Sequence, residues 1–89
     1  MEYKPEAIAE VIRRLRKQRK KSQEVLSGLA GMERAHLSMV ERSGRIPTLY
    51  TIWRIADALD MRPSELVALI EEKMEKDISC LLYTSPSPR

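Results

Sequence analysis

Apolar residues recur at intervals of three and four positions along most of the chain, which is the spacing of one face of an α-helix. The pattern predicts five helices, and no segment alternates as a strand would. The apolar positions of the first helix are Ile8, Val11, Ile12 and Leu15, those of the second are Val25, Leu26, Leu29 and Ala30, and those of the third are Leu37 and Val40. The fourth helix has Leu49, Ile52, Trp53, Ile55, Ala56 and Leu59, and the fifth has Leu66, Val67, Leu69, Ile70 and Met74. The expected fold class is therefore all-α, with helices packed on helices.

Residues that favour helix starts stand before several of these segments. Pro5 suits the first turn of a helix, where its missing N–H leaves no hydrogen bond unmade. Ser22 and Thr48 carry side-chain oxygens that can cap the second and fourth helices. The fifth helix opens at residues 63–65, Pro-Ser-Glu, and residues 43–47, Ser-Gly-Arg-Ile-Pro, separate the third helix from the fourth.

A tight turn joins the second and third helices. Two short helices that cross at about 90–120° need a turn residue that tolerates positive φ, and Gly31 meets that need. They also need apolar side chains that hold the crossing in place. The candidates are Leu26, Ala30, Met32, Leu37 and Val40. Residues 23–41 thus predict a helix-turn-helix, in which the third helix begins near Glu33.

The end of the chain, Cys80 to Arg89, differs abruptly in composition from the rest. With one choice of codons, this segment matches in frame the adapter of a transposon-based sequencing library. We therefore exclude residues 80–89 from the fold. A genuine disordered tail rich in Ser and Pro is the alternative. What remains is one domain, residues 1–79, with its core over about residues 7–70. The cysteine lies in the excluded segment, and we expect no cysteine chemistry.

The charges are unevenly placed, although the formal net charge of the chain is only +3. Seven of the nine residues from 13 to 21 are basic, whereas residues 71–77 hold four acids and two lysines. We therefore expect one positive end that can meet an anionic partner. Neither a membrane-length apolar run nor a secretory signal is evident, so we expect a cytoplasmic protein that does not bind membranes.

Several short motifs follow one another along the chain: Leu15-Arg16, Ser22-Gln23-Glu24, Leu26, Gly31, Leu37-Ser38, Val40-Glu41-Arg42, Pro47-Thr48-Leu49 and Ile55-Ala56-Asp57-Ala58-Leu59. In this order and spacing they resemble the helix-turn-helix family of phage Cro and repressor proteins, also called the XRE family. The resemblance implies a compact five-helix, lambda-repressor-like domain of prokaryotic or phage origin. It also implies a homodimeric transcriptional regulator that binds a double-stranded DNA operator. The chain looks most like short stand-alone members, such as restriction-modification controller proteins.

Two departures from the family pattern affect this interpretation. Asp60 stands where the family prefers Gly between the fourth and fifth helices, and an Asp can adopt the left-handed geometry required there. Glu33 replaces the Ser or Thr that often opens the third helix. The second change falls on the part of the domain that would touch DNA.

By resemblance, the third helix enters the major groove with its leading side chains against base edges. The candidate base-reading residues are Glu33, Arg34, Ala35, His36 and Met39. Arg34 can donate two hydrogen bonds to guanine O6 and N7, and Glu33 can accept one from cytosine N4. The alternatives are a solvated Arg34, a Glu33 that complements the helix dipole, and a Met39 that packs at the periphery. His36 lacks ligand-type neighbours at metal spacing, and we expect neither metal nor cofactor.

A second set of residues can contact phosphates, which positions a protein on DNA without reading its sequence. Gln23 is the clearest case, because the first turn of a helix offers free backbone N–H groups to an anion. The candidates are Arg19, Lys20, Lys21, Gln23, Ser38, Arg42 and Arg45. Each of these residues has a solvated surface position as its alternative.

Two further sets of residues concern the support of the third helix and the assembly of a dimer. By resemblance, Arg16 and Glu41 pair across the first and third helices and hold the third helix at its angle. The apolar residues of the last two helices exceed what one small core needs, and a two-fold dimer would bury the surplus. The candidate dimer face consists of Trp53, Val67, Ile70 and Met74.

Other functions stay open at this stage. The same fold could serve as an antitoxin or another protein-interaction module, or as the N-terminal part of a longer regulator. A basic amphipathic surface that binds membranes is a third reading. Within the chain we find no nucleophile–base pair, metal cluster or phosphate loop, so we expect no enzyme.

Overall fold

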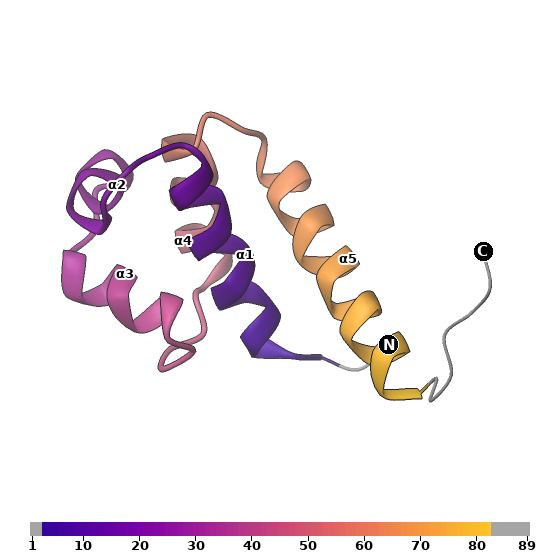
Figure 1. Ribbon diagram of the computed structural model, residues 1–89. Helices are drawn as coiled ribbons and strands as arrows, with labels where there is room; N and C mark the ends of the chain where they lie inside the picture. Colours follow the sequence, from indigo (N-terminus) through magenta and orange to yellow (C-terminus); the bar gives the residue numbers. More distant parts are fainter. Residues whose placement is uncertain (1–2, 83–89) are drawn as a thin grey trace.

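The computed structural model describes residues 3–82, and for residues 77–82 the backbone alone. Its helices are α1 (Pro5–Gln18), α2 (Gln23–Ala30), α3 (Arg34–Glu41), α4 (Leu49–Ala58) and α5 (Pro63–Leu82), as labelled in Figure 1. No strand occurs among residues 3–82, and the predicted all-α class is confirmed. Helix α5 extends into the segment 80–89 that we had excluded, and residues 83–89 lie outside the described residues.

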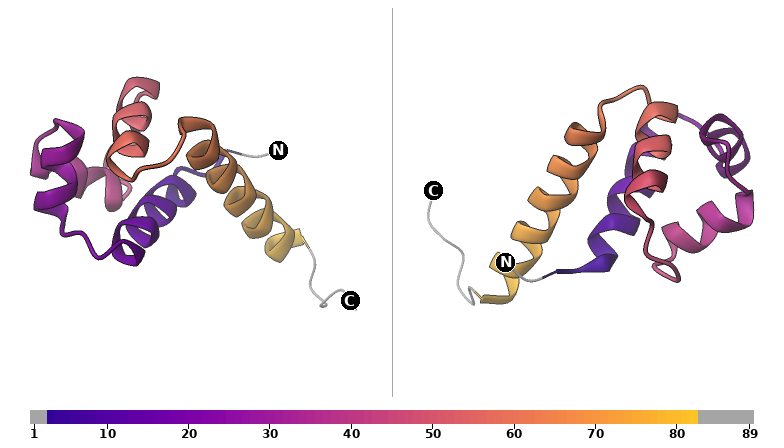
Figure 2. Two further views of the ribbon diagram at one scale, coloured as in Figure 1. Left: turned by 90° about the horizontal axis from the view of Figure 1, so that it is seen from above. Right: turned by 180° about the vertical axis from the view of Figure 1, so that it is seen from behind.

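Helix α1 runs through the middle of the molecule, with α3 on one side and α5 on the other (Figure 1). Helix α2 packs against α3 and α4, and α4 packs against α5. All the views in Figures 1 and 2 place α2 and α3 at one end of the molecule, away from the C-terminal part of α5. The helix-turn-helix is therefore presented at one end of the domain.

One apolar core joins all five helices. Its most deeply buried side chains are Val11, Ile12, Leu26, Leu37, Val40, Ile55, Leu59 and Leu66. Burying a side chain of this size contributes about 1.5–3 kcal/mol. Helices α2 and α3 have only eight residues each, too few for a stable isolated helix. Their position and their helicity therefore depend on the core behind them.

The helix starts follow the predicted local chemistry. The side chains of Ser22 and Thr48 each accept a hydrogen bond of 3.1 Å from the backbone N–H three residues further on. Pro5 is the first residue of α1. At the start of α5, the Arg62 backbone N–H donates to Glu65 Oε1 at 2.8 Å. These contacts satisfy N–H groups that the helices themselves leave unpaired.

Gly31 ends α2 in the left-handed conformation, with φ 68° and ψ 34°. The N–H of Met32, the residue after it, donates to the Ser27 carbonyl at 2.9 Å and closes the turn. Asp60 has φ 63°, which confirms the left-handed geometry expected where the family prefers glycine. Lys20 and Ser43 also have positive φ, and the sequence does not predict a left-handed residue at either position.

Three apolar residues assigned to the inner face of their helices are exposed. In α2, Leu26 and Ala30 face the core, whereas Val25 and Leu29 point outward. Neighbouring residues are about 100° apart around a helix, so two adjacent apolar stripes cannot both face one core. Leu49 is exposed as well, because it lies at the very start of α4, before the residues that meet the core.

Ile70 and Met74 are buried in the core of the single chain, which corrects their assignment to a dimer face. They follow Leu66 at four-residue intervals and lie on the same side of α5. That side packs against the rest of the domain, since α5 contacts both α1 and α4. The surplus of apolar residues on α5 is therefore smaller than the sequence suggested.

Candidate nucleic-acid interface

Helix α3 has one buried side and one exposed side. Leu37, Val40 and Glu41 face inward, and Glu41 is only 2% exposed although it carries a charge. The residues that lead into the helix, Glu33 and Arg34, are exposed because they stand at its start, and Ala35 and Met39 are exposed on the side away from the core. An eight-residue helix at the end of the molecule thus offers its first turn to a partner.

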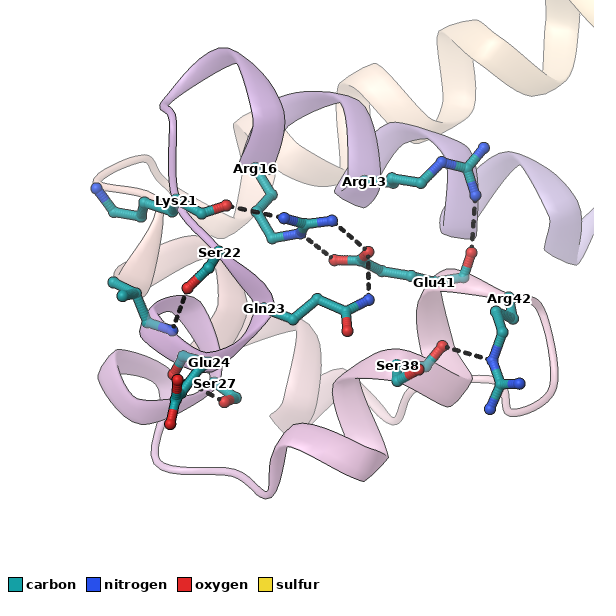
Figure 3. Close-up of polar contacts among 11 residues, drawn as sticks. Arg13, Arg16, Lys21, Ser22, Gln23, Glu24, Ser27, Ser38, Glu41 and Arg42 are labelled. Atoms are coloured by element: carbon teal, nitrogen blue, oxygen red, sulfur yellow. Dashed lines mark hydrogen bonds and ion pairs between the residues drawn. The ribbon is translucent and has the colours of Figure 1, made fainter.

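The buried carboxylate of Glu41 is held by donors from two other helices (Figure 3). Arg16 Nε donates to Glu41 Oε2 at 2.7 Å, and Arg16 Nη2 donates to Oε1 at 3.0 Å. Gln23 Nε2 also donates to Oε1, at 3.0 Å. A bidentate arginine with a further amide donor satisfies a buried carboxylate well. These three side chains, which we call the Glu41 network, tie α1, α2 and α3 together.

Two further hydrogen bonds extend the Glu41 network along α1. Arg16 Nη1 donates to the Lys21 carbonyl at 2.8 Å, which holds the loop between α1 and α2. Arg13 Nη1 donates to the Glu41 carbonyl at 2.9 Å, at the last residue of α3. A cation at the C-terminal end of a helix also interacts favourably with the helix dipole. Both ends of the helix-turn-helix are therefore anchored to α1.

The candidate base-reading residues differ in their exposure. Glu33, Arg34, Ala35 and Met39 are exposed, whereas His36 is only half-buried. Glu33 is the N-cap residue of α3, and its side chain makes no capping hydrogen bond. Four side chains of the five are thus on the surface of the first two turns of α3.

Most of the candidate phosphate-binding residues lie before α2 or after α3. Arg19 and Lys20 are exposed in the loop before α2, and Arg42 and Arg45 are exposed after α3. The side chains of Lys21 and Ser38 are half-buried. Gln23 differs from the others, because its amide N–H already donates to Glu41. The first turn of α2 keeps its backbone N–H groups, but the side chain of Gln23 belongs to the Glu41 network.

A shallow depression of about 360 Å³ lies where the first turns of α2 and α3 meet. Its lining residues are Arg16, Ser22, Gln23, Glu24 and Arg34. Arg34 therefore lies beside the start of α2 as well as at the start of α3, within reach of a partner that touches both helices.

On the side formed by α4 and α5, Trp53 and Val67 are 56% and 43% exposed. Leu49 and Tyr50, at the start of α4, are exposed as well. A groove of about 490 Å³ is lined by Tyr3, Leu49 and Val67, and the largely buried Ile70 and Met74 also line it. Two of the four candidate dimer residues are thus available for contact with another molecule.

Within residues 3–76, no group of three or more His, Cys, Asp or Glu side chains is arranged to hold a metal ion. Among the helices that the structure describes, none combines the length and the hydropathy needed to cross a lipid bilayer.

The sequence interpretation missed the roles of Gln23 and Arg13 in the Glu41 network. A usable signal exists for Gln23, because it is spaced three and seven residues from Leu26 and Ala30, on the buried stripe of α2. A polar residue on such a stripe needs a buried partner. Arg54 was also missed: it packs over the turn at Gly31, and no local pattern indicates that contact.

Comparison with known proteins identifies a family and a curated relative. The helix-turn-helix family (HTH_3) matches residues 12–66. The HTH-type transcriptional regulator y4dL of Sinorhizobium fredii is 33% identical over 79 residues, which cover 84% of this chain and 40% of that protein. The chain therefore spans less than half the length of this relative.

Solved structures of small controller proteins are also similar. The restriction-modification controller protein C.AhdI from Aeromonas hydrophila is 37% identical, with a TM-score of 0.67 over 70% of this chain and 94% of that one. The controller protein C.Esp1396I, solved bound to a 19 base pair DNA duplex, is 20% identical. Its TM-score of 0.73, over 79% of this chain and 93% of that one, reflects likeness of fold alone.

Proposed function

The chain belongs to the helix-turn-helix family, and from this premise we propose that it is a transcriptional regulator that binds a specific DNA operator through α3. The observation that supports this proposal is that α3 has one buried side and one exposed side. Its inner side is fixed by the core and by the Glu41 network, while its leading residues, Glu33 to Ala35, are exposed. A rigid helix with exposed leading residues suits the major groove, which is about 12 Å wide.

Arg34 is the first candidate for reading sequence. It is the first residue of α3, and a planar guanidinium can engage guanine O6 and N7 together. Glu33 would act beside it as an acceptor for cytosine N4 and would disfavour other bases, because a carboxylate without a donor is costly near phosphates. Ala35 and Met39 offer apolar contact to thymine methyl groups, and His36 is a secondary candidate.

The exposed basic residues around α3 position the domain on the phosphates. Arg19 and Lys20 precede α2, and Arg42 and Arg45 follow α3, so the two pairs stand on either side of the helix-turn-helix in the sequence. Lys21, Ser38 and the first backbone N–H groups of α2, at Gln23, complete the phosphate-binding set. In this arrangement, the Arg16–Glu41 pair keeps α3 at the angle that the groove requires.

A two-fold dimer would let the protein read two half-sites. We propose that the exposed apolar surface of α4 and α5, centred on Trp53 and Val67, forms the contact between two copies. Binding alone is the proposed activity, and we assign the chain no catalytic step. A regulator of this kind acts where the DNA lies, in the cytoplasm of a prokaryotic cell.

Selection from a random-oligonucleotide library at moderate ionic strength tests this function. We expect the unmodified protein to enrich one sequence motif, arranged as an inverted repeat with half-site centres about 34–36 Å apart. Enrichment of a single half-site would retain the DNA-binding proposal and contradict the dimer. A library that shows no enrichment at all would contradict the proposed function.

A further inference from the structure

Arg54 of α4 reaches across to the turn of the helix-turn-helix. Its guanidinium lies over the ring of Tyr50, with Cζ 5.0 Å from the ring centroid, and Nη1 donates to the Tyr50 hydroxyl at 2.6 Å. The same guanidinium lies against the backbone of Gly31. A β-carbon added to Gly31 would lie 3.0 Å from Arg54 Cζ and would collide with Nη2. The absence of a side chain at Gly31 is what lets Arg54 approach the turn.

Arg54 places a positive charge near the C-terminal end of α2, where the turn begins. Gly31 is the C-cap of α2, and the last turn of α2 contains no basic residue. The carbonyl groups at the end of a helix carry a partial negative charge, which a nearby cation stabilises. Arg54 supplies that cation from another helix, since α4 packs directly against α2.

Tyr50 limits the freedom of Arg54. An exposed arginine is ordinarily solvated and contributes little, because fixing its long side chain costs entropy. Here the planar guanidinium is held between an aromatic ring and a backbone, and a planar group fixed in this way loses less freedom for each contact. Tyr50 is itself 67% exposed, so burial in the core does not account for its position.

We propose that Arg54, held by Tyr50, is a positioning residue that fixes the turn at Gly31 and thereby sets the direction in which α3 leaves α2. The inference deepens the proposed function, on which it rests. It predicts that sequence-specific binding depends on a side chain of α4 that lies outside the helix-turn-helix. Affinity for DNA of unrelated sequence should not depend on Arg54, because that affinity follows from the overall phosphate contacts.

The test compares Arg54→Met with Arg62→Met. Methionine keeps an unbranched stem and removes the guanidinium, and Arg62 is an exposed arginine just before α5, so both variants lose the same charge. Two readouts are used: amide hydrogen exchange at residues 31–34 of the free protein, and affinity for the duplex selected by the unmodified protein against a scrambled duplex.

We expect Arg54→Met to speed exchange at residues 31–34 about tenfold and to weaken binding of the selected duplex about tenfold relative to Arg62→Met. Binding of the scrambled duplex should be the same in both variants. Arg54→Lys, which retains the charge at the end of α2, should recover part of both losses. If Arg54 contributed only to overall stability, its replacement would weaken binding of the selected and the scrambled duplex alike.

The proposal is overturned if Arg54→Met and Arg62→Met give equal exchange rates and equal discrimination between the duplexes. Should Arg54→Met unfold, Tyr50→Phe, which removes only an exposed hydroxyl, must still speed exchange at the turn, and an unchanged rate there overturns the proposal. If the unmodified protein selects no sequence, the proposed function fails, and the exchange rates alone decide whether Arg54 fixes the turn.

Discussion

Replacing Arg16 with methionine should lower the free energy of unfolding by about 3–5 kcal/mol, because it strands the buried carboxylate of Glu41. Arg16 supplies two of the three hydrogen bonds to this carboxylate and also holds the Lys21 carbonyl. Only Gln23 would remain as a side-chain donor. A domain of this size has a total stability of about 4–13 kcal/mol, so the expected loss is a large fraction of the total.

Urea denaturation followed by circular dichroism measures this loss, and Arg14→Met is the matched control. Arg14 is exposed on the same helix, and its replacement removes the same charge, so we expect a change within about 0.5 kcal/mol. The double variant Arg16→Met with Glu41→Leu should recover part of the stability, because no charge is then left buried. A loss below about 1 kcal/mol in Arg16→Met would mean that the pair does not support α3.

Arg34→Ala should weaken binding to the selected operator by about 1–3 kcal/mol and leave the affinity for unrelated DNA almost unchanged. The physical reason is that a hydrogen bond to a base edge contributes to affinity only where the matching base is present. Lys20→Ala removes the same charge from the loop before α2 and serves as the matched control. It should weaken binding to both kinds of DNA and lower the salt slope of binding by about one unit.

Titration of both variants at several salt concentrations distinguishes the two roles. Equal effects of Arg34→Ala and Lys20→Ala on the selected operator and on unrelated DNA would refute the division between base reading and phosphate contact. In that case Arg34 would belong with the phosphate contacts, which its place beside the first turn of α2 also allows.

Much of the fold could be predicted because its signals are local. Ser22 and Thr48 begin helices through hydrogen bonds with residues three positions away, and Pro5 begins one through its own fixed backbone. Gly31 ends a helix through its own backbone conformation. The resemblance to the XRE family, drawn from short motifs in order, agrees with the helix-turn-helix family match to residues 12–66. Local chemistry and family pattern thus pointed to the same five-helix architecture.

The errors arose where one helix carries two neighbouring apolar stripes. In α2 the stripe of Leu26 and Ala30 is buried while the stripe of Val25 and Leu29 is exposed, and composition alone cannot rank them. In α5 the sequence predicts Ile70 and Met74 in a dimer surface, whereas both are buried in the core. The choice depends on which side meets a partner helix, and that is a property of the tertiary structure.

The site was harder to predict, because its supporting contacts join residues far apart in the sequence. Gln23 remains a candidate phosphate contact through the first turn of α2, but the sequence does not indicate that its amide donates to Glu41 of another helix. Arg54 lies in α4 and meets Gly31 through space. Side chains of this kind carry no periodic signal, and they become visible only when the helices are packed.

The central claim is that α3 reads base edges in the major groove, and methylation interference on the selected operator tests it most directly. Methylation of guanine N7 blocks the major-groove acceptor that Arg34 would use, whereas methylation of adenine N3 alters the minor groove. We expect N7 methylation at one guanine in each half-site to abolish binding by the unmodified protein but to have little further effect on Arg34→Ala. Interference confined to adenine N3, or N7 interference that is unchanged in Arg34→Ala, would contradict the account.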